Sequence, residues 1–207
     1  MNQRQRFLDL WHRMGAARHG TETFAEVSSA YEEPHRVYHT LEHIRDCLQQ
    51  LDDAPSGDQG RDLVETAIWF HDLVYDPGSP DNENRSAAAA GRMLEAAGLT
   101  PKLVEEIGRL ILLTRHLEPP ADSGGRLLCD VDLSILGRAP PEFAEFERRI
   151  RAEYVRVPEP EYRTGRAQVL QRFLERRPLY ATAYFRDRYE APARLNLQDA
   201  LRRLART

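Results

Sequence analysis

The spacing of apolar residues follows the helical period along nearly the whole chain, and this constrains the fold more than any other feature. Val37, Leu41, Ile44, Leu48 and Leu51 recur at intervals that place them on one face of an amphipathic helix. No stretch shows the sustained alternation of apolar and polar residues that is typical of a half-buried strand. The sequence therefore predicts an all-α protein.

Clusters of Gly, Pro and small polar residues divide the chain into its predicted helices. We expect one helix from residue 37 to the turn at 55–60 and a second over 63–75. The second is apolar nearly all round, which is typical of a helix enclosed by others. Further helices are predicted at 87–97, closed by Gly98, and at 101–116, with Thr100 as cap and Pro101 in the first turn. An apolar segment at 127–136 and three or four helices in 141–206 follow.

A chain of 207 residues without internal repeats or a long linker is typical of one compact domain, so we expect residues 1–207 to form a single domain with additional C-terminal helices. The formal net charge is -4, and acidic residues interleave with the late arginines, which favours solvated helix faces over a nucleic-acid footprint. The oligomeric state cannot be inferred from these patterns.

The N-terminus is polar, and no apolar run approaches the roughly 18 to 20 residues of a membrane span, so we expect no membrane association and a cytoplasmic location. Cys47 and Cys129 lie inside apolar helical patterns without CxxC spacing. This favours buried, inert free thiols.

The dipeptide His71-Asp72 interrupts the apolar segment Ala67–Val74. An ionised aspartate in such surroundings costs several kcal/mol unless a positive charge compensates it. A divalent metal ion would do so, as would a buried arginine, and the aspartate would also be stabilised by capping a neighbouring helix.

His39 and His43 lie four residues apart and so project from one side of the predicted helix, away from its apolar stripe. Either this pair faces solvent, or the helix has a second buried side that brings imidazoles to a site.

Asp130 and Asp132, two apart among apolar residues, point in different directions on a helix, so at most one is a metal ligand. The other would cap a helix or orient a histidine.

The order His39, His43, His71-Asp72, Asp132 resembles that of the HD-domain metal-dependent phosphohydrolases, and its first and last pieces resemble cyclic-nucleotide phosphodiesterases. Over nearly the whole chain the sequence is similar to a bacterial group of predicted HD-superfamily phosphohydrolases whose substrate is unsettled. The similar segments are Tyr38–Ile44, Trp69–Tyr75, Asp81–Ala87, Ile150–Tyr154 and Glu190–Leu197.

This resemblance implies an HD-domain helical bundle in which His43, His71, Asp72 and Asp132 bind a divalent metal ion. Nitrogen and oxygen ligands suit Mn, Fe, Zn, Mg or Ni without choosing among them. A second metal ion is an option, because Asp72 would approach it through a shared water. For His116 two roles are open. It is either a ligand of a second metal or of a phosphate, or an exposed residue at a helix C-terminus.

The implied activity is hydrolysis of a phosphate ester, in a nucleotide or another small phosphorylated metabolite, by a metal-bound water. Asp72 would take part in catalysis as a ligand of the metal, and His39 would protonate the leaving oxygen as general acid. One alternative is a diiron oxygenase on the same scaffold, although His116 is the one obvious extra ligand. Another is a non-catalytic nucleotide-binding regulatory module.

Several other residues are weaker candidates for the same site. Glu83 and Asn84 would contact a metal-bound water or a ligand, or simply decorate a helix N-terminus. Arginine forks hold phosphate well, but a surface ion pair is the safer interpretation for any one arginine. The candidates for phosphate binding are Arg115, Tyr154, Arg166 and Arg194, whereas Trp69 and Tyr75 are expected in the core.

Overall fold

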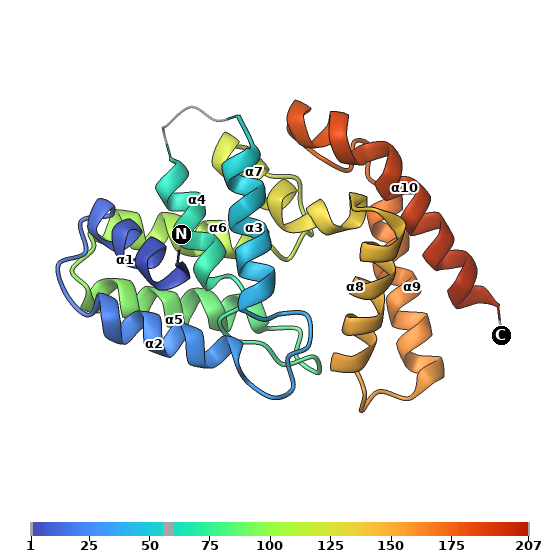
Figure 1. Ribbon diagram of the computed structural model, residues 1–207, viewed down its shortest axis with the longest axis horizontal. Coiled ribbons are helices and arrows are strands. Elements are labelled where there is room, and N and C mark those ends of the chain that lie inside the picture. The colour runs from blue at the N-terminus through green and yellow to red at the C-terminus, as the bar shows by residue number, and fades with distance from the viewer. Residues whose placement is uncertain (1, 56–59, 207) are drawn as a thin grey trace.

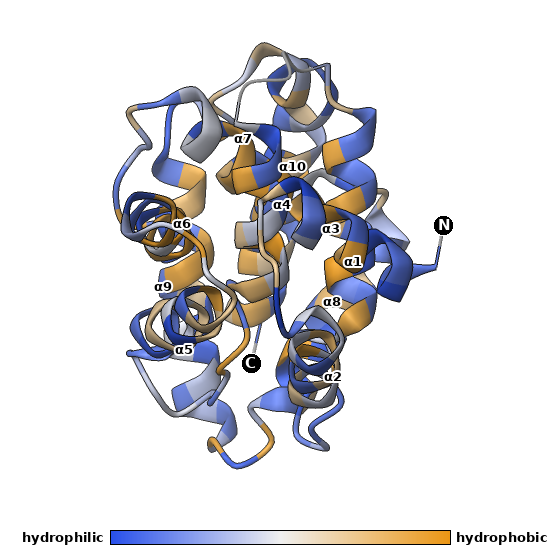
Figure 2. Ribbon diagram, turned by 90° about the vertical axis from the view of Figure 1, so that its left-hand side faces the viewer, coloured by the Kyte–Doolittle hydropathy of each residue, from blue (hydrophilic) through white to orange (hydrophobic). Residues whose placement is uncertain are grey.

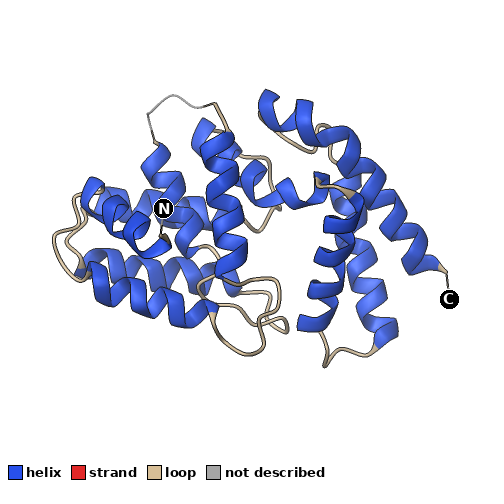
Figure 3. Ribbon diagram, viewed as in Figure 1, coloured by secondary structure: helices blue, strands red, loops and turns tan. Residues whose placement is uncertain are grey.

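The computed structural model describes residues 2–55 and 60–206, and within these ranges every regular element is a helix (Figure 3). The all-α prediction is therefore confirmed for the described residues. The first seven α-helices are α1 (Gln3–Arg13), α2 (Gly20–Tyr31), α3 (Leu41–Asp53), α4 (Arg61–Phe70), α5 (Asn82–Ala96), α6 (Pro101–Leu113) and α7 (Ser123–Asp132). The short 3-10 helix η1 (Leu133–Gly137) leads into α8 (Pro140–Glu153), α9 (Glu159–Glu175) and α10 (Ala183–Ala205).

Helices α1 to α6 gather on one side of the molecule and α8 to α10 on the other, with α7 and η1 between them (Figure 1). Helix η1 packs against α7, α8 and α10, so it connects the two groups. Hydrophobic residues gather on the helix faces that meet inside the molecule (Figure 2).

Helix α4 is the enclosed central helix that the sequence predicts. Every residue from Val64 to Phe70 is buried, and α4 contacts α1, α3, α5, α6 and α7. The ring of Trp69 meets that of Phe7 edge-on at 5.3 Å, and its backbone carbonyl accepts a hydrogen bond from the Tyr31 hydroxyl. Burial of this apolar helix on all sides fixes where its C-terminal end, with His71 and Asp72, lies.

Local sequence signals set several helix ends. The side chain of Thr40 caps α3 by accepting a hydrogen bond from the Glu42 backbone N–H. The side chain of Asp122 caps α7 by accepting one from the Gly125 backbone N–H. Gly98 follows the end of α5 with a φ of 92°, the left-handed conformation that glycine adopts without strain. Thr100 lies at the start of α6 as predicted, but its side chain makes no capping hydrogen bond.

Four predicted boundaries are wrong. The helix expected from residue 37 begins at Leu41, and the one expected to run to Tyr75 ends at Phe70. Helix α5 begins five residues before the predicted position 87, and α6 ends at Leu113, three residues short of His116. Three helices fill 141–206, as expected, and of the predicted turn 55–60, residues 56–59 lie outside the described residues.

Candidate metal and catalytic site

Four predicted site residues meet where three helices end or begin. His43 lies in the first turn of α3, His71 is the C-terminal cap of α4 with Asp72 next to it, and Asp132 is the last residue of α7. The structure thus brings together side chains that are up to 89 residues apart, from residue 43 to residue 132.

The donor atoms of these four side chains face one another. Nε2 of His43 lies 3.2 Å from Nε2 of His71 and 3.3 Å from Oδ1 of Asp132. Nε2 of His71 lies 3.0 Å from Oδ2 of Asp72 and 3.6 Å from Oδ1 of Asp132, and Asp72 Oδ2 is 3.7 Å from His43 Nε2. Ligands about 2.1 Å from one ion are separated by roughly 3.0 to 4.2 Å. The observed separations fit a common metal ion, and the ligand atoms of His43, His71 and Asp132 all lie within 4.8 Å of one another.

The protonation of His71 suits metal binding. Its Nδ1–H donates to the backbone carbonyl of Ile68 at 2.9 Å, so that in the neutral imidazole Nε2 carries the lone pair. Nε2 of His43 also points into the group, and two imidazole nitrogens 3.2 Å apart need a proton or a cation between them.

The electrostatics of these four side chains also favour a bound cation. Burial acts to lower the pKa of His71, but the charge of Asp72 and hydrogen bonds to Asp132 and Asp72 raise it well above its ordinary value. Burial acts to raise the pKa of Asp132, and hydrogen bonds from His116, His43 and His71 nevertheless hold it well below the ordinary range. The site is therefore buried, strongly negative and built to stabilise positive charge.

His39 does not lie on the helix of His43, contrary to the prediction. It precedes the Thr40 cap in a turn, and its position is determined by Glu153 at the end of α8. One carboxylate oxygen of Glu153 accepts the backbone N–H groups of Val37, Tyr38 and His39 at 2.7–2.9 Å. The other accepts the His39 Nδ1–H at 2.7 Å and the Tyr75 hydroxyl at 2.8 Å. These bonds leave the Nε2 edge of the His39 ring for contacts in the cavity.

Glu153 is the main functional candidate that the sequence analysis missed. With Phe143, Phe146 and Ile150 it continues the buried face of α8, at a position where an apolar residue is expected. A glutamate on an apolar face was the signal that could have identified it.

Arg36 was also missed, and nothing in the sequence distinguishes it from other arginines. Its guanidinium is completely buried and donates to the backbone carbonyls of Asp72, Leu73 and His39. It also pairs with Glu33. Arg36 thereby holds the turn that carries Asp72 against the turn that carries His39.

His116 is not the exposed residue of the second predicted alternative, and its role as a ligand of a second metal or a phosphate stays a prediction. It follows α6 in the left-handed conformation, with a φ of 54°, and its side chain is only 10 % exposed. Its Nε2–H donates to Oδ2 of Asp132 at 2.8 Å, so it orients the carboxylate whose other oxygen faces His43. Its Nδ1 is buried without a partner. Strained backbone of this kind is frequent at functional sites.

The weaker candidates divide between the site and the surface. Glu83 lines the cavity, whereas Arg115 does not and lies 3.8–3.9 Å from the carboxylates of Asp81 and Glu83. We refer to the side chains of His43, His71, Asp72 and Asp132 as the metal-facing groups. Asn84 is exposed and donates to the side chain of Asp81, so it does not reach them.

A cavity of about 530 Å³ opens above these groups. His39, His71, Asp72 and Asp132 line one part of it, and residues of α8, α9, η1, the start of α5 and the neighbouring turns line the rest. Tyr75 also lines it, which corrects the expectation that Tyr75 packs in the core.

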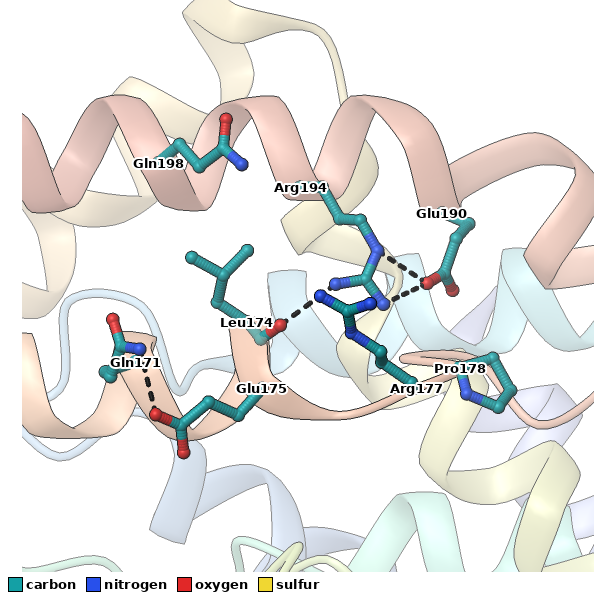
Figure 4. A pocket seen from close by; sticks show the side chains of 8 residues that line it. All are labelled: Gln171, Leu174, Glu175, Arg177, Pro178, Glu190, Arg194 and Gln198. Carbon is teal, nitrogen blue, oxygen red and sulfur yellow. Dashed lines mark hydrogen bonds and ion pairs between the residues drawn. The ribbon is translucent and has the colours of Figure 1, made fainter.

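Two phosphate candidates are engaged in ion pairs. Arg166 lines the cavity, pairs with Glu147 and lies over the ring of Phe146. Arg194 lines a separate cavity between α9 and α10, where it binds Glu190 and the backbone carbonyl of Leu174 (Figure 4). The role of Arg194 there is structural, because these bonds join α10 to the end of α9.

The remaining expectations concern Asp130 and the cysteines. Asp130 accepts hydrogen bonds from the backbone N–H groups of Ala181 and Thr182, and it therefore holds the segment that leads into α10, without capping its first turn. Cys47 and Cys129 are free and buried, as predicted, and burial raises the pKa of the Cys129 thiol to about 12. Cys47 Sγ lies 3.7 Å from Nδ1 of His43.

Comparisons of the chain with protein-family models, curated proteins and solved structures found no match. Within the described residues, no helix combines the length and the apolar character needed to cross a membrane.

Proposed function

We propose that this chain is a metal-dependent phosphohydrolase with a single HD-type helical domain over residues 1–207. The observation that carries the proposal is a pair of imidazole nitrogens 3.2 Å apart, each 3.0–3.7 Å from carboxylate oxygens of Asp72 and Asp132, beside a cavity that His71, Asp72 and Asp132 line. The resemblance in the order of His39, His43, His71-Asp72 and Asp132 supports the same activity.

In this proposal His43, His71, Asp72 and Asp132 hold one divalent cation. A cation bound there supplies an activated water at neutral pH and offsets the negative charge that develops on the phosphoryl oxygens. The Asp132 carboxylate is oriented by His116, and His71 by the carbonyl of Ile68. Because His116 is already bonded to Asp132, one metal ion is favoured over two.

His39 is the proposed general acid. Its Nδ1–H donates to Glu153, so the proton available for the leaving oxygen is on Nε2. Burial acts to lower the pKa of His39, but the charge of Asp72 and the hydrogen bond to Glu153 raise it above its ordinary value. Both interactions favour the protonated form of the imidazole. The ring of Tyr75 packs against that of His39, with centroids 4.2 Å apart and the planes tilted by 32°, and so restricts its orientation.

The test compares three alanine variants by bound metal and by turnover of p-nitrophenyl phosphate. His43→Ala should lose both, because it removes a ligand. His39→Ala should keep the metal and lose turnover by roughly 100-fold or more, as expected for removal of a general acid. His12→Ala, on the exposed face of α1, is the control and should keep both.

Loss of metal from His39→Ala to the same extent as from His43→Ala would make His39 a ligand and not the acid. Failure of the wild-type protein to hydrolyse any phosphate ester with Mn, Fe, Zn, Mg or Ni would refute the proposed activity.

A further inference from the structure

The cavity beside the metal-facing groups is polar and charged at one end and mainly apolar over the rest of its wall. Apart from those groups, most of its wall is apolar, and η1, α8, α9 and the turn between α8 and α9 contribute much of it. The phenylalanine and tyrosine rings that line it are those of Tyr38, Tyr75, Phe146, Tyr154, Tyr162 and Phe173. Its volume of about 530 Å³ lies within the range of cavities that enclose most of a small organic ligand. A wall of this kind binds the flat or apolar body of a ligand by burying it from water.

The charges that line the cavity are mainly negative. The carboxylates are those of Asp72, Glu83, Asp132 and Glu161, and Arg166 is the one lysine or arginine among the described lining residues. The guanidinium of Arg166 is already paired with Glu147, which neutralises it.

A bound divalent cation would balance Asp72 and Asp132, and Glu83 already lies 3.9 Å from the guanidinium of Arg115. One phosphoryl group would then find the cation and His39. Each additional phosphate needs further cationic side chains, and Arg166, the one arginine on the described wall, is already paired with Glu147, whereas the other donors there, such as Asn82 and Thr114, are uncharged.

We propose that the substrate is an ester with a single phosphoryl group on an apolar, ring-bearing alcohol, and that di- and triphosphates are poor substrates. This inference rests on the proposed function and adds the class of substrate to it. The phosphoryl group faces His39 and the metal-facing residues, and the ring of the alcohol lies between α8 and α9.

The first experiment varies the number of phosphates on a constant ring-bearing body. Adenosine mono-, di- and triphosphate are assayed with the Mn-loaded protein at constant free Mn, and kcat/KM is compared. We expect a fall of roughly tenfold or more for each added phosphate. Equal or faster hydrolysis of the triphosphate would overturn the inference while leaving the phosphohydrolase activity intact.

The second experiment varies the alcohol and the apolar wall. The wild-type protein should prefer 1-naphthyl phosphate to glycerol 3-phosphate, because only the first fills the wall between α8 and α9. Val169 is a partly exposed lining residue of α9, so Val169→Trp narrows the cavity there. This variant should reduce the ratio of kcat/KM for the two esters by roughly tenfold or more. Gln168→Trp, on the exposed side of the same helix, is the matched control.

A ratio unchanged in Val169→Trp, or no preference for the naphthyl ester in the wild type, would overturn the inference. If Val169→Trp does not fold by circular dichroism, Val169→Ser replaces it and should shift the ratio in the same direction. Absence of hydrolysis for every ester, p-nitrophenyl phosphate included, would instead refute the proposed function, so the two failures are distinguishable.

Discussion

Replacing Glu153 by glutamine should destabilise the metal-free protein by about 3 kcal/mol at about pH 6 and by less than half of that at about pH 3. The side chain of Glu153 is 0 % exposed, so solvent does not screen its interactions. Burial acts to raise its pKa, but the hydrogen bond and charge of His39 and the backbone donors of residues 37–39 lower it from 4.5 to about 2. Since one pKa unit corresponds to about 1.4 kcal/mol, this difference gives the stated magnitude.

The direction of the pH dependence follows from the lowered pKa. An unfolded glutamate takes up a proton near its ordinary pKa of 4.5, whereas the folded one stays ionised down to about 2. The stabilisation is therefore fully present above pH 4.5 and is lost as the pH falls toward 2. Glutamine cannot ionise and lacks this stabilisation at every pH.

The assay is urea unfolding of both proteins in EDTA, followed by circular dichroism at several pH values from about 6 to about 3. Glu142→Gln, an exposed glutamate on the same helix, serves as control and should change the free energy of unfolding by at most about 0.5 kcal/mol. A Glu153→Gln effect that is independent of pH, or below about 1 kcal/mol throughout, would refute the ionised, multiply bonded carboxylate described above.

Two further perturbations test the parts that hold the site. Arg36→Met should destabilise the protein by about 3 kcal/mol and weaken metal binding roughly tenfold or more, because the backbone carbonyl of Asp72 loses its buried donor; unchanged metal affinity in a titration would contradict this. Gly137→Ala should lower the Tm, because its new Cβ would lie 2.5–2.9 Å from atoms of Tyr189, including backbone, and overpacking costs about 1–3 kcal/mol. Gly108→Ala meets no atom within 4 Å in the interior of α6, and should raise the Tm or leave it unchanged; similar losses in both variants would rule out the clash.

The fold class and the enclosed helix were predictable because both depend on local periodicity. Seven consecutive residues, Val64 to Phe70, are buried in α4 as the apolar run predicts. The wrong boundaries, in contrast, have long-range causes. The backbone N–H groups of residues 37–39 are taken by Glu153, which lies 114 or more residues away, so this segment is a turn and not the start of α3. The carbonyls of Asp72 and Leu73 are similarly taken by Arg36.

The candidate site was predictable to the extent that its members disturb an apolar pattern. His71, Asp72 and Asp132 stand out among buried residues, and the structure brings them together with His43. The bond between His116 and Asp132 depends on how the turn after α6 folds back, and no spacing in the sequence encodes that.

The position of Glu153 has a consequence for how this protein can vary. The four side chains proposed to hold a metal all precede η1, whereas α8, α9 and the turn between them contribute much of the apolar wall of the cavity. Exchanging the wall residues of these two helices while keeping Glu153 would alter the fit of a ligand and leave the proposed metal ligands and the proposed proton donor in place. The late helices are therefore the natural region in which to redesign the cavity for a different ligand, with Glu153 as the fixed point.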